Sequence, residues 1–481
     1  MFLHTRPCSA VAIFISALLG SPTSAEAAPA LDGSTMSWPW ALPFAGLLLT
    51  IAIGPQLFPR IWHAHHGKIA AFWSLAMLAP MVALHGVAAT IAVLVHALLG
   101  EYLSFIVLLF SLYTVAGGIL VTCRLNGSPL SNTAILALGT VSASVVGTTG
   151  AAMILIRPII RANERRRHRT HVIIFFIILV ANVGGALTPL GDPPLFVGFL
   201  RGVDFFWTAQ HLWLQTTIVA VMVLGLFMLL DWLFSRRDDD GAERYGSAFE
   251  KIRVRGKINF ALLALIIAAI ILSASWQPGL ALTILDTKIE LQNTVRDLAL
   301  ILVALLSLWL TPEEHREAND FTWGPIREVA KLFAGIFVAI IPVLAMLQAG
   351  RDGQFAFLLA AVTANDGQPH EAAYFWLTGL LSAFLDNAPT YLAFFELAGG
   401  NAVELMGSLA GTLAAISMGA VYMGALTYIG NAPNLMIYAI AEERGIKMPS
   451  FFGYMFWASL ILLPLFLLLT FLPIAPVLKF V

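Results

Sequence analysis

Hydrophobic residues along this chain come in long runs that are separated by short polar segments. A helix needs about 20 mostly apolar residues to cross a lipid bilayer. The clear runs of this kind cover residues 39–58, 69–88, 101–122, 210–234, 258–275, 295–311, 332–349 and 449–472. The pattern therefore predicts an all-α polytopic membrane protein.

Four further apolar stretches are interrupted. Residues 171–200 and 405–440 are broken in the middle by Gly and Pro, and residues 131–161 and 373–397 also carry breaks. We interpret the first pair as broken spans and the second pair as re-entrant hairpins. With the eight clear runs, this gives about ten transmembrane helices plus two re-entrant hairpins.

The hairpin interpretation rests on the distribution of charge. Lys and Arg are enriched in cytoplasmic loops, and here they gather in residues 60–68, 161–171 and 236–257 and around Arg444 and Lys447. The weakly basic or acidic segments are those around Glu101 and residues 201–209, 276–294, 350–371 and 398–404. These two classes alternate along the chain only if each hairpin enters and leaves on the same side. Irregular backbone at membrane depth is tolerated where it is buried or lines a water-filled cavity.

The same order of elements occurs twice, which indicates two repeats. Residues 39–234 and 258–478 each hold three spans, a hairpin, a broken span and a final span. Five spans is an odd number, so the two repeats are expected to run in opposite directions, with residues 235–257 as a cytoplasmic linker. Inverted repeats with broken helices are typical of secondary transporters, which bind their solute near the middle of the membrane.

The two broken spans share a motif. The pattern G-A-L-T-x-x-G-[DN]-x-P occupies residues 185–194 and again 424–433. Gly and Pro interrupt a helix and leave backbone groups free, so carbonyls can face a cation and amides an anion. A carboxylate at membrane depth costs at least about 2.5 kcal/mol, which points to function at Asp192. The binding candidates in these spans are Thr188, Gly191, Asp192, Thr427, Gly430, Asn431 and Asn434.

The hairpin tips supply further candidates. The second tip, SAFLDNAPTYLAFF, contains Asp386, Asn387 and Thr390 in an otherwise apolar run. The first tip, SASVVGTTGAAMILIRP, has no charge before its final Arg and offers Thr148 and Thr149. Small polar residues in membrane helices also serve close packing, so both interpretations stay open for the first tip. The candidate Na⁺ ligands are the two carboxylates, Asp192 and Asp386.

Composition narrows the class of protein. Hydrophobic residues make up 59% of the 481 residues and charged residues 11%, against about 25% charged residues in soluble domains. The net charge of −1 gives no reason to expect a nucleic-acid partner. The sequence contains no Gly-rich phosphate loop with Lys, no HExxH and no evident nucleophile–base pair. We therefore expect a transporter in a lipid bilayer, not an enzyme, with no cofactor beyond Na⁺ and H⁺ as coupling ions.

The N-terminus is typical of a secretory signal peptide. Arg6 precedes an apolar core at residues 11–20, and small residues around Ala25 and Ala27 give a plausible cleavage point. We assign residues 1–28 to this signal. The alternative is an uncleaved first helix.

The tip SAFLDNAPT at residues 382–390, together with the two broken spans, resembles the ion transporter superfamily. This group includes NhaD-type sodium/proton antiporters, the membrane subunit of the arsenite pump, and citrate and dicarboxylate carriers. The resemblance implies a multi-pass protein of a bacterial inner membrane, often a homodimer, with scaffold and mobile transport parts that work by an elevator-like movement. It also implies that hairpin tips and broken helices bind ion and substrate. The Asn-Thr motif of the family is present at Asn387–Thr390, but Val-Val-Gly-Thr-Thr-Gly replaces it in the first hairpin, which argues against two symmetric sodium sites.

Two functions remain in competition. In cation/proton antiport, Asp192 and Asp386 would meet near the membrane centre and bind either Na⁺ or H⁺, because loss of water favours the protonated form of a carboxyl group. In the alternative, a cation at Asp386 would drive uptake of citrate or another carboxylate. Such an anion calls for a basic partner, and Arg157 is the one nearby candidate. The antiport hypothesis is favoured. A further acid, Asp231, lies near the end of its span, where we expect interfacial water to solvate it.

Overall fold

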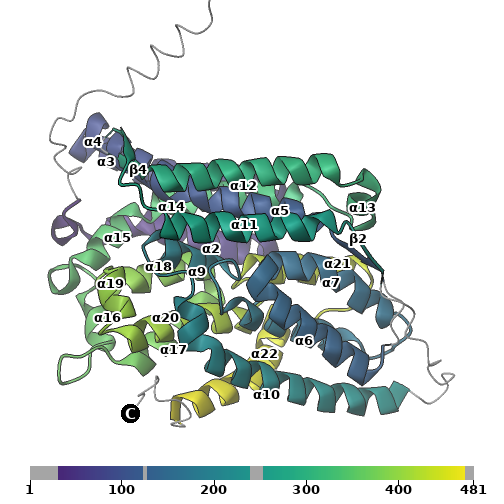
Figure 1. Ribbon diagram of the computed structural model, residues 1–481. Coiled ribbons are helices and arrows are strands. Elements are labelled where there is room, and N and C mark those ends of the chain that lie inside the picture. Colours follow the sequence, from purple (N-terminus) through teal and green to yellow (C-terminus); the bar gives the residue numbers. More distant parts are fainter. Residues whose placement is uncertain (1–30, 123–126, 239–252, 286, 472–481) are drawn as a thin grey trace, which may run out of the picture.

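The computed structural model describes residues 31–122, 127–238, 253–285 and 287–471 (Figure 1). The predicted signal peptide lies outside these residues. So do positions 239–252 of the predicted linker and the end of the second repeat from residue 472.

The first half of the chain is helical with a single short strand. It begins with the 3₁₀ turns η1 (Gly33–Thr35) and η2 (Trp38–Ala41). The elements that follow are α2 (Leu42–Leu57), α3 (Pro59–His85), α4 (Val87–Val95), the π-helical η3 (His96–Tyr102), α5 (Leu103–Gly117), β1 (Leu120–Thr122), α6 (Pro129–Val146), α7 (Thr148–Ala162), α8 (Thr170–Val180), η4 (Val183–Gly185), α9 (Pro193–Leu200) and α10 (Trp207–Asp238).

The second half repeats this plan with a few short additions. Its elements are β2 (Arg253–Arg255), α11 (Ile258–Ser275), β3 (Ala281–Ile284), β4 (Thr287–Glu290), α12 (Leu291–Leu310), α13 (Glu313–Ala318), α14 (Gly324–Ala339), α15 (Ile341–Gln348), η5 (Gly350–Asp352), α16 (Ala356–Ala361), α17 (Glu371–Phe384), α18 (Asn387–Leu397), α19 (Ala402–Met406), α20 (Ala410–Met423), η6 (Gly424–Leu426), α21 (Ala432–Glu443) and α22 (Phe451–Phe471). The strands form two small antiparallel pairs, in which Val121 faces Val254 and Leu282 faces Ile289.

The predicted fold class, an all-α polytopic membrane protein, is confirmed. Within the described residues, eight helices are long and apolar enough to cross a membrane, and α14 with α15, bent by 43°, makes a ninth. Seven of the eight clear apolar runs overlap seven of these helices, and the run 332–349 overlaps the bent pair. The remaining long helix is α6, which we predicted as one arm of the first hairpin. Two boundaries differ. Residues 60–68, expected as a loop, are the first turns of α3. Residues 87–117 form a continuous helical run, with a π-helical turn at His96–Tyr102 where we expected a loop around Glu101. A π-turn keeps a helix continuous while it accommodates an extra residue.

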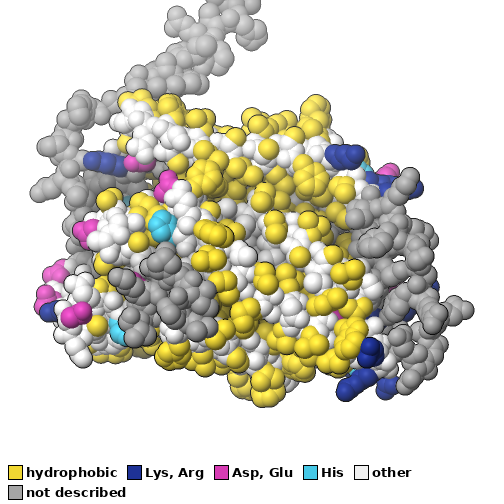
Figure 2. Space-filling model, turned by 60° about the horizontal axis from the view of Figure 1, so that its bottom comes forward, with side chains coloured by type: hydrophobic (Ala, Val, Ile, Leu, Met, Phe, Trp, Pro, Cys, Tyr) yellow, Lys and Arg dark blue, Asp and Glu magenta, His cyan; other side chains and the backbone are white. Residues whose placement is uncertain are grey.

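The surface agrees with a position across a bilayer. Figure 2 shows a broad band of hydrophobic side chains, with Lys and Arg gathered mainly at one end and acidic side chains mainly at the other. Contacts group the segments in the same way. Arg169 bonds to the carbonyl of Gly445 and His168 stacks on Phe234, whereas Trp207 bonds to Met406. We call the end near Arg169 the basic end and the end near Met406 the opposite end.

The helices form two layers. In Figure 1, α5, α11, α12 and α14 lie together along one side of the molecule, while α6, α10, α17 and α22 lie along the other. We call α2–α5 with α11–α15 the wall layer, and α6–α10 with α17–α22 the site layer. Each layer draws helices from both halves of the chain, so neither half folds around a separate core.

Two helical hairpins lie within the site layer. The ends of the α6–α7 hairpin meet, because Asn132 and Asn163 donate hydrogen bonds to each other at 2.9 and 2.8 Å. Its tip turns at Gly147, whose φ of +81° disfavours any residue with a Cβ. In the α17–α18 hairpin, the rings of Tyr374 and Phe394 are 6.3 Å apart. Both predicted hairpins are therefore formed as pairs of packed helices.

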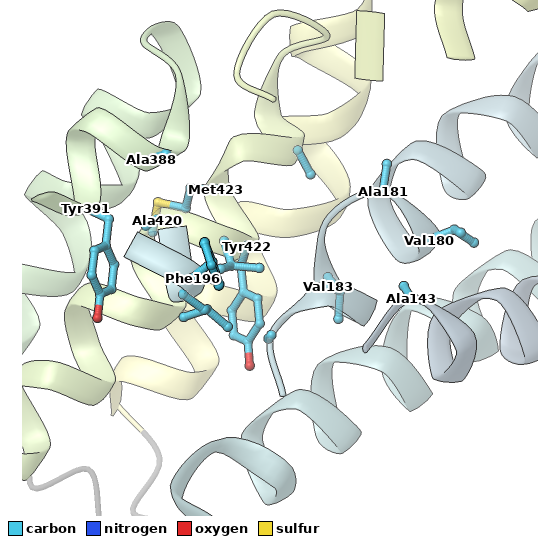
Figure 3. Packing of buried hydrophobic residues seen from close by; sticks show 14 of the residues in the cluster. Ala143, Val180, Ala181, Val183, Phe196, Ala388, Tyr391, Ala420, Tyr422 and Met423 are labelled. Atoms are coloured by element: carbon cyan, nitrogen blue, oxygen red, sulfur yellow. The ribbon is translucent and has the colours of Figure 1, made fainter. Parts of the chain in front are cut away.

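Both predicted broken spans are also present. The first unwinds between α8 and α9, and the second between α20 and α21. Figure 3 shows buried apolar side chains packed around these breaks, among them Val180 and Val183 beside the first and Tyr422 and Met423 beside the second. This packing shields the irregular backbone from lipid, as its free polar groups require.

Candidate ion-binding site

Asp192 lies where both breaks and both hairpin tips meet. Its Oδ1 accepts hydrogen bonds from Thr148 Oγ1 at 3.2 Å and from Asn431 Nδ2 at 3.0 Å. Its Oδ2 accepts from Asn387 Nδ2 at 2.6 Å. All four side chains are 1% exposed or less. One carboxylate thus connects the first hairpin tip, the second hairpin tip and the second broken helix.

The residues next to Asp192 leave its carboxylate without a local hydrogen bond, so it can bond to residues far away in the sequence. Asp192 is the N-cap of α9, a position where Asp normally accepts from amides in the first turn. Here Pro193 and Pro194 occupy that turn and have no N–H, so the side chain makes no capping bond. The backbone of Asn431, at φ −152° and ψ 139°, closely matches that of Asp192, at φ −143° and ψ 143°. The motif therefore turns both side chains away from their own helices.

In both halves, a threonine of the broken span forms a hydrogen bond to the tip of the hairpin. Thr188 Oγ1 donates to the carbonyl of Ser144, and Thr427 Oγ1 donates to that of Ala383, each across 44 residues. These threonines support the hairpins four residues before Thr148 and Asn387. Their hydroxyls are therefore committed to positioning the tips.

The glycines of the motif permit close backbone contact. A Cβ at Gly191 would collide with the carbonyl of Gly185, and a Cβ at Gly430 would approach that of Gly424 to 2.6 Å. The amide of Thr148 also bonds to the carbonyl of Gly191 at 2.8 Å. Glycine is required here because the chain folds back on itself.

A second ring of amides surrounds the centre. Asn434 donates to the carbonyls of Gly424 at 2.9 Å and Thr427 at 3.1 Å. Asn182 donates to Asn434 Oδ1 at 2.8 Å. Sequence reasoning missed Asn182, which is fully buried. Its signal was present: Asn182 is a polar residue inside an apolar run, two residues before the Gly184-Gly185 pair.

Two buried oxygens in the site lack a hydrogen-bond donor. Among the described residues, the Oδ1 atoms of Asn387 and Asn431 have no partner, although both amides donate to Asp192. Buried acceptors are nearly always paired, so each exception calls for an explanation. Together with the Asp192 carboxylate, these atoms form a cluster of hard oxygen donors.

A cavity opens beside this cluster. It holds about 820 Å³ of space, part of which is open to the surroundings. The site layer contributes Thr148, Thr149, Asp192, Asp386 and Asn431 to its lining. The facing wall is apolar and includes Leu108, Leu112, Val329 and Phe333 of α5 and α14. No Lys, Arg or His belongs to the lining in the described part of the chain.

The remaining candidates lie at the edge of the cluster. Asp386 is half-buried and caps α18 by accepting from the amide of Ala388 at 3.2 Å. Thr390 bonds to the carbonyl of Asp386 at 3.0 Å, within its own helix. Asp386 therefore borders the cavity as a second acid, whereas the hydroxyl of Thr390 is engaged locally.

Two expectations from the sequence are corrected. Asp231 is not solvated at an interface: it is fully buried and paired with Arg166 at 2.6 Å and His171 at 2.7 Å. Arg157 does not line the cavity, and its Nε is paired with Asp320 at 3.0 Å. Both partners come from segments far away in the sequence, which a linear motif does not reveal.

Comparison with known proteins gives a family. The family described as "Putative citrate transport" matches residues 33–474. The chain belongs to this family. An uncharacterized transporter of Mycobacterium bovis is 26% identical over 337 residues, which cover 67% of this chain and 72% of that protein. A 46 kDa membrane protein of Mycobacterium leprae is 25% identical over 330 residues, with the same coverage. Membership of this family makes the chain a multi-pass membrane transporter and agrees with the resemblance seen in the sequence.

Proposed function

We propose that this member of the family is a secondary active transporter that exchanges Na⁺ for H⁺ at Asp192. One observation carries the proposal. Asp192 is buried and held by three neutral donors, and no basic side chain among the described residues lines the cavity beside it. A charge in such a position is costly unless a mobile cation neutralises it. We place the protein in a bacterial inner membrane and assign it no catalytic role.

The donor set fits a small hard cation. Carboxylate, amide and hydroxyl oxygens are the ligands that hard cations prefer. Asp192, the free oxygens of Asn387 and Asn431, and Thr148 would supply them, with Asp386 as a second acid at the cavity. Na⁺ and H⁺ would exclude each other at Asp192, because both neutralise the same carboxylate. That competition is the basis of exchange.

Cation-coupled transport of citrate or another carboxylate is the second candidate. The family description favours it, and so does one feature of the cavity. Four helices, α7, α9, α18 and α21, begin at its edge, and helix N-termini attract anions. Against it stand the apolar wall, the two acids and the engagement of Arg157 by Asp320, which together leave a multivalent anion without a basic partner.

Reconstituted protein separates the two functions. Na⁺-driven proton movement and uptake of labelled citrate would be measured side by side in proteoliposomes, with the wild type and Asp192→Asn. We expect exchange without citrate uptake in the wild type, loss of exchange in Asp192→Asn, and normal exchange in the exposed control Asp366→Asn. Citrate uptake that needs Na⁺, or normal exchange in Asp192→Asn, would overturn the proposal.

A further inference from the structure

The two layers contact each other mainly through apolar side chains. A small second cavity between them is lined by Val197 and Leu392 of the site layer and by Phe333 and Phe337 of the wall layer. Close to the main cavity, a Cβ at Gly150 on α7 would approach Ala116 on α5 to 3.1 Å. Apolar contacts have no preferred direction, so this interface resists sliding less than a hydrogen-bonded one would.

At the basic end, an ion cluster joins the layers. Asp320, between α13 and α14 of the wall layer, accepts from Arg157 Nε at 3.0 Å and from Arg444 Nη2 at 2.9 Å. Arg157 lies on α7 of the first half, and Arg444 directly follows α21 of the second half. One wall carboxylate thus holds both halves of the site layer. We call Asp320, Arg157 and Arg444 the basic-end cluster.

At the opposite end, a second ion cluster joins the layers through one Arg of the site layer. Arg201, which directly follows α9, is paired with Glu396 of α18 and with Glu101 of the wall layer, the latter at 2.8 Å. Gln348 of α15 adds a hydrogen bond to Glu396 at 2.9 Å. We call Glu101, Arg201 and Glu396 the opposite-end cluster. In both clusters, the Arg after a broken helix is paired with a carboxylate of the wall. A residue of a hairpin helix completes each cluster, Arg157 by pairing with Asp320 and Glu396 by pairing with Arg201.

We propose that Asp320 and Glu101 are positioning residues for transport, which hold the site layer at one place along the wall. An ion pair acts over a nitrogen–oxygen distance of about 4 Å. A shift of the site layer by more than this along the wall separates both clusters, so both open whenever Asp192 is carried toward either end. The inference rests on the proposed transport function but not on the identity of the solute.

The two clusters differ in exposure, which predicts an asymmetry. The side chains of Asp320 and Arg444 are 56% and 42% exposed, and exposed ion pairs contribute little. Those of Glu101 and Arg201 are 16% and 22% exposed, and that of Glu396 is 2% exposed. The opposite-end cluster therefore contributes more than the basic-end cluster to fixing the site layer on the wall layer. Loss of Glu101 has a larger effect on the transport rate than loss of Asp320.

Reversible cross-linking tests the proposal. In a protein with Cys8→Ser and Cys123→Ser, a bifunctional thiosulfonate reagent would join Asp320→Cys to Arg444→Cys, and separately Glu101→Cys to Arg201→Cys. The control pair, Thr170→Cys with Lys447→Cys, lies within the site layer, where Thr170 Oγ1 donates to the carbonyl of Lys447 at 3.1 Å. Na⁺/H⁺ exchange and citrate uptake would both be measured before the reagent, after it, and after a reductant.

Either cross-link between layers should stop transport until the reductant is added, and the control cross-link should leave it unchanged. Continued transport in a fully cross-linked inter-layer pair overturns the proposal, since the layers would then not separate. Wild-type protein that moves neither solute instead refutes the proposed function.

Charge-neutral variants provide a second measurement if the cysteine pairs are inactive. Glu101→Gln should change the maximal rate about threefold or more, and Asp320→Asn by less. The half-saturating concentration should stay the same, because the site is intact. Glu101→Asp and Asp320→Glu should restore the rate in part. A normal rate in both neutral variants, or an effect on half-saturation alone, contradicts the positioning role.

Discussion

Two buried aspartates of this protein have opposite surroundings. Asp231, near the end of α10, is fully buried and paired with Arg166 at 2.6 Å and His171 at 2.7 Å, with a further bond from Asn132 at 2.9 Å. Asp192, 1% exposed, meets only neutral donors among the described residues. The first carboxylate is compensated by the fold itself, and the second is not.

This difference separates a structural acid from a candidate transport acid. A buried ion pair with satisfied hydrogen bonds fixes the elements that it joins, and removing one partner leaves an uncompensated charge. Asp231 connects α10 to the base of the first hairpin and to the start of α8. A carboxylate without a fixed counter-ion stays available to a mobile one, so burial alone does not distinguish the two roles.

The largest expected effect is at Asp192. The substitution Asp192→Asn keeps the size of the side chain but removes its charge, so a cation loses its central ligand. We expect Na⁺-linked proton movement in proteoliposomes to fall to the level of empty liposomes, while the protein elutes normally on size exclusion. Exchange near the wild-type rate in this variant would show that the cation binds elsewhere and that Asp192 is not the transport acid.

The converse pattern is expected at Asp231. Asp231→Asn leaves Arg166 buried without its counter-charge, which lowers the free energy of unfolding by about 3–5 kcal/mol. The half-saturating Na⁺ concentration of the folded fraction should be unchanged. Thermal unfolding in detergent, compared with exposed Asp366→Asn, measures the first effect and exchange assays the second. A normal melting temperature would show that this ion cluster has no structural role.

A smaller effect is expected at Asn387, and it tests whether this partner of Asp192 also binds the cation. Asn387→Ala removes one donor to the carboxylate and one free oxygen, at a cost of about 1–3 kcal/mol. The half-saturating Na⁺ concentration should rise by about tenfold or more. Asn401→Ala, at the exposed cap of α19, is the control and should change stability alone. Equal Na⁺ affinities in the two variants would argue against Asn387 as a ligand.

The smallest effect distinguishes Thr188 from Thr427, the two threonines whose hydroxyls bond to the hairpin tips. Thr188→Val removes a hydroxyl bond to Ser144 and should lower the unfolding free energy by about 1 kcal/mol. Thr427→Val should cost more, because Thr427 Oγ1 also accepts from the amides of Ile429 at 3.3 Å and Gly430 at 3.1 Å. Melting temperatures of the two variants test this order. The reverse order would mean that these amide bonds add nothing.

Much of the fold followed from local properties of the chain. The apolar runs predicted the spans, and Gly and Pro predicted the breaks around Asp192 and Asn431. The charge pattern predicted that residues 161–171 and the segment around Arg444 and Lys447 share an end of the molecule, and Arg169 indeed bonds to the carbonyl of Gly445. The π-turn at His96–Tyr102 was missed, because an apolar run does not reveal where a helix continues.

The candidate site was predicted only in part. The motif identified Asp192 and Asn431 as candidates and the second hairpin tip identified Asn387, and the structure brings the three side chains together. Asn182 was overlooked, and Thr188 was expected to bind ions, although its hydroxyl braces a hairpin. Each of these roles depends on a partner from another element.

The sequence by itself determined which segments enter the membrane, where they break and which acids lie in them, because length, hydropathy and Gly/Pro content act within a few helical turns. The tertiary structure alone decided what each acid meets. Asn387 and Asn431 reach Asp192 across 195 and 239 residues. Arg166 reaches Asp231 across 65. Such pairings follow from how helices pack, and packing selects partners by shape and charge in space, which the order of residues along one segment does not encode.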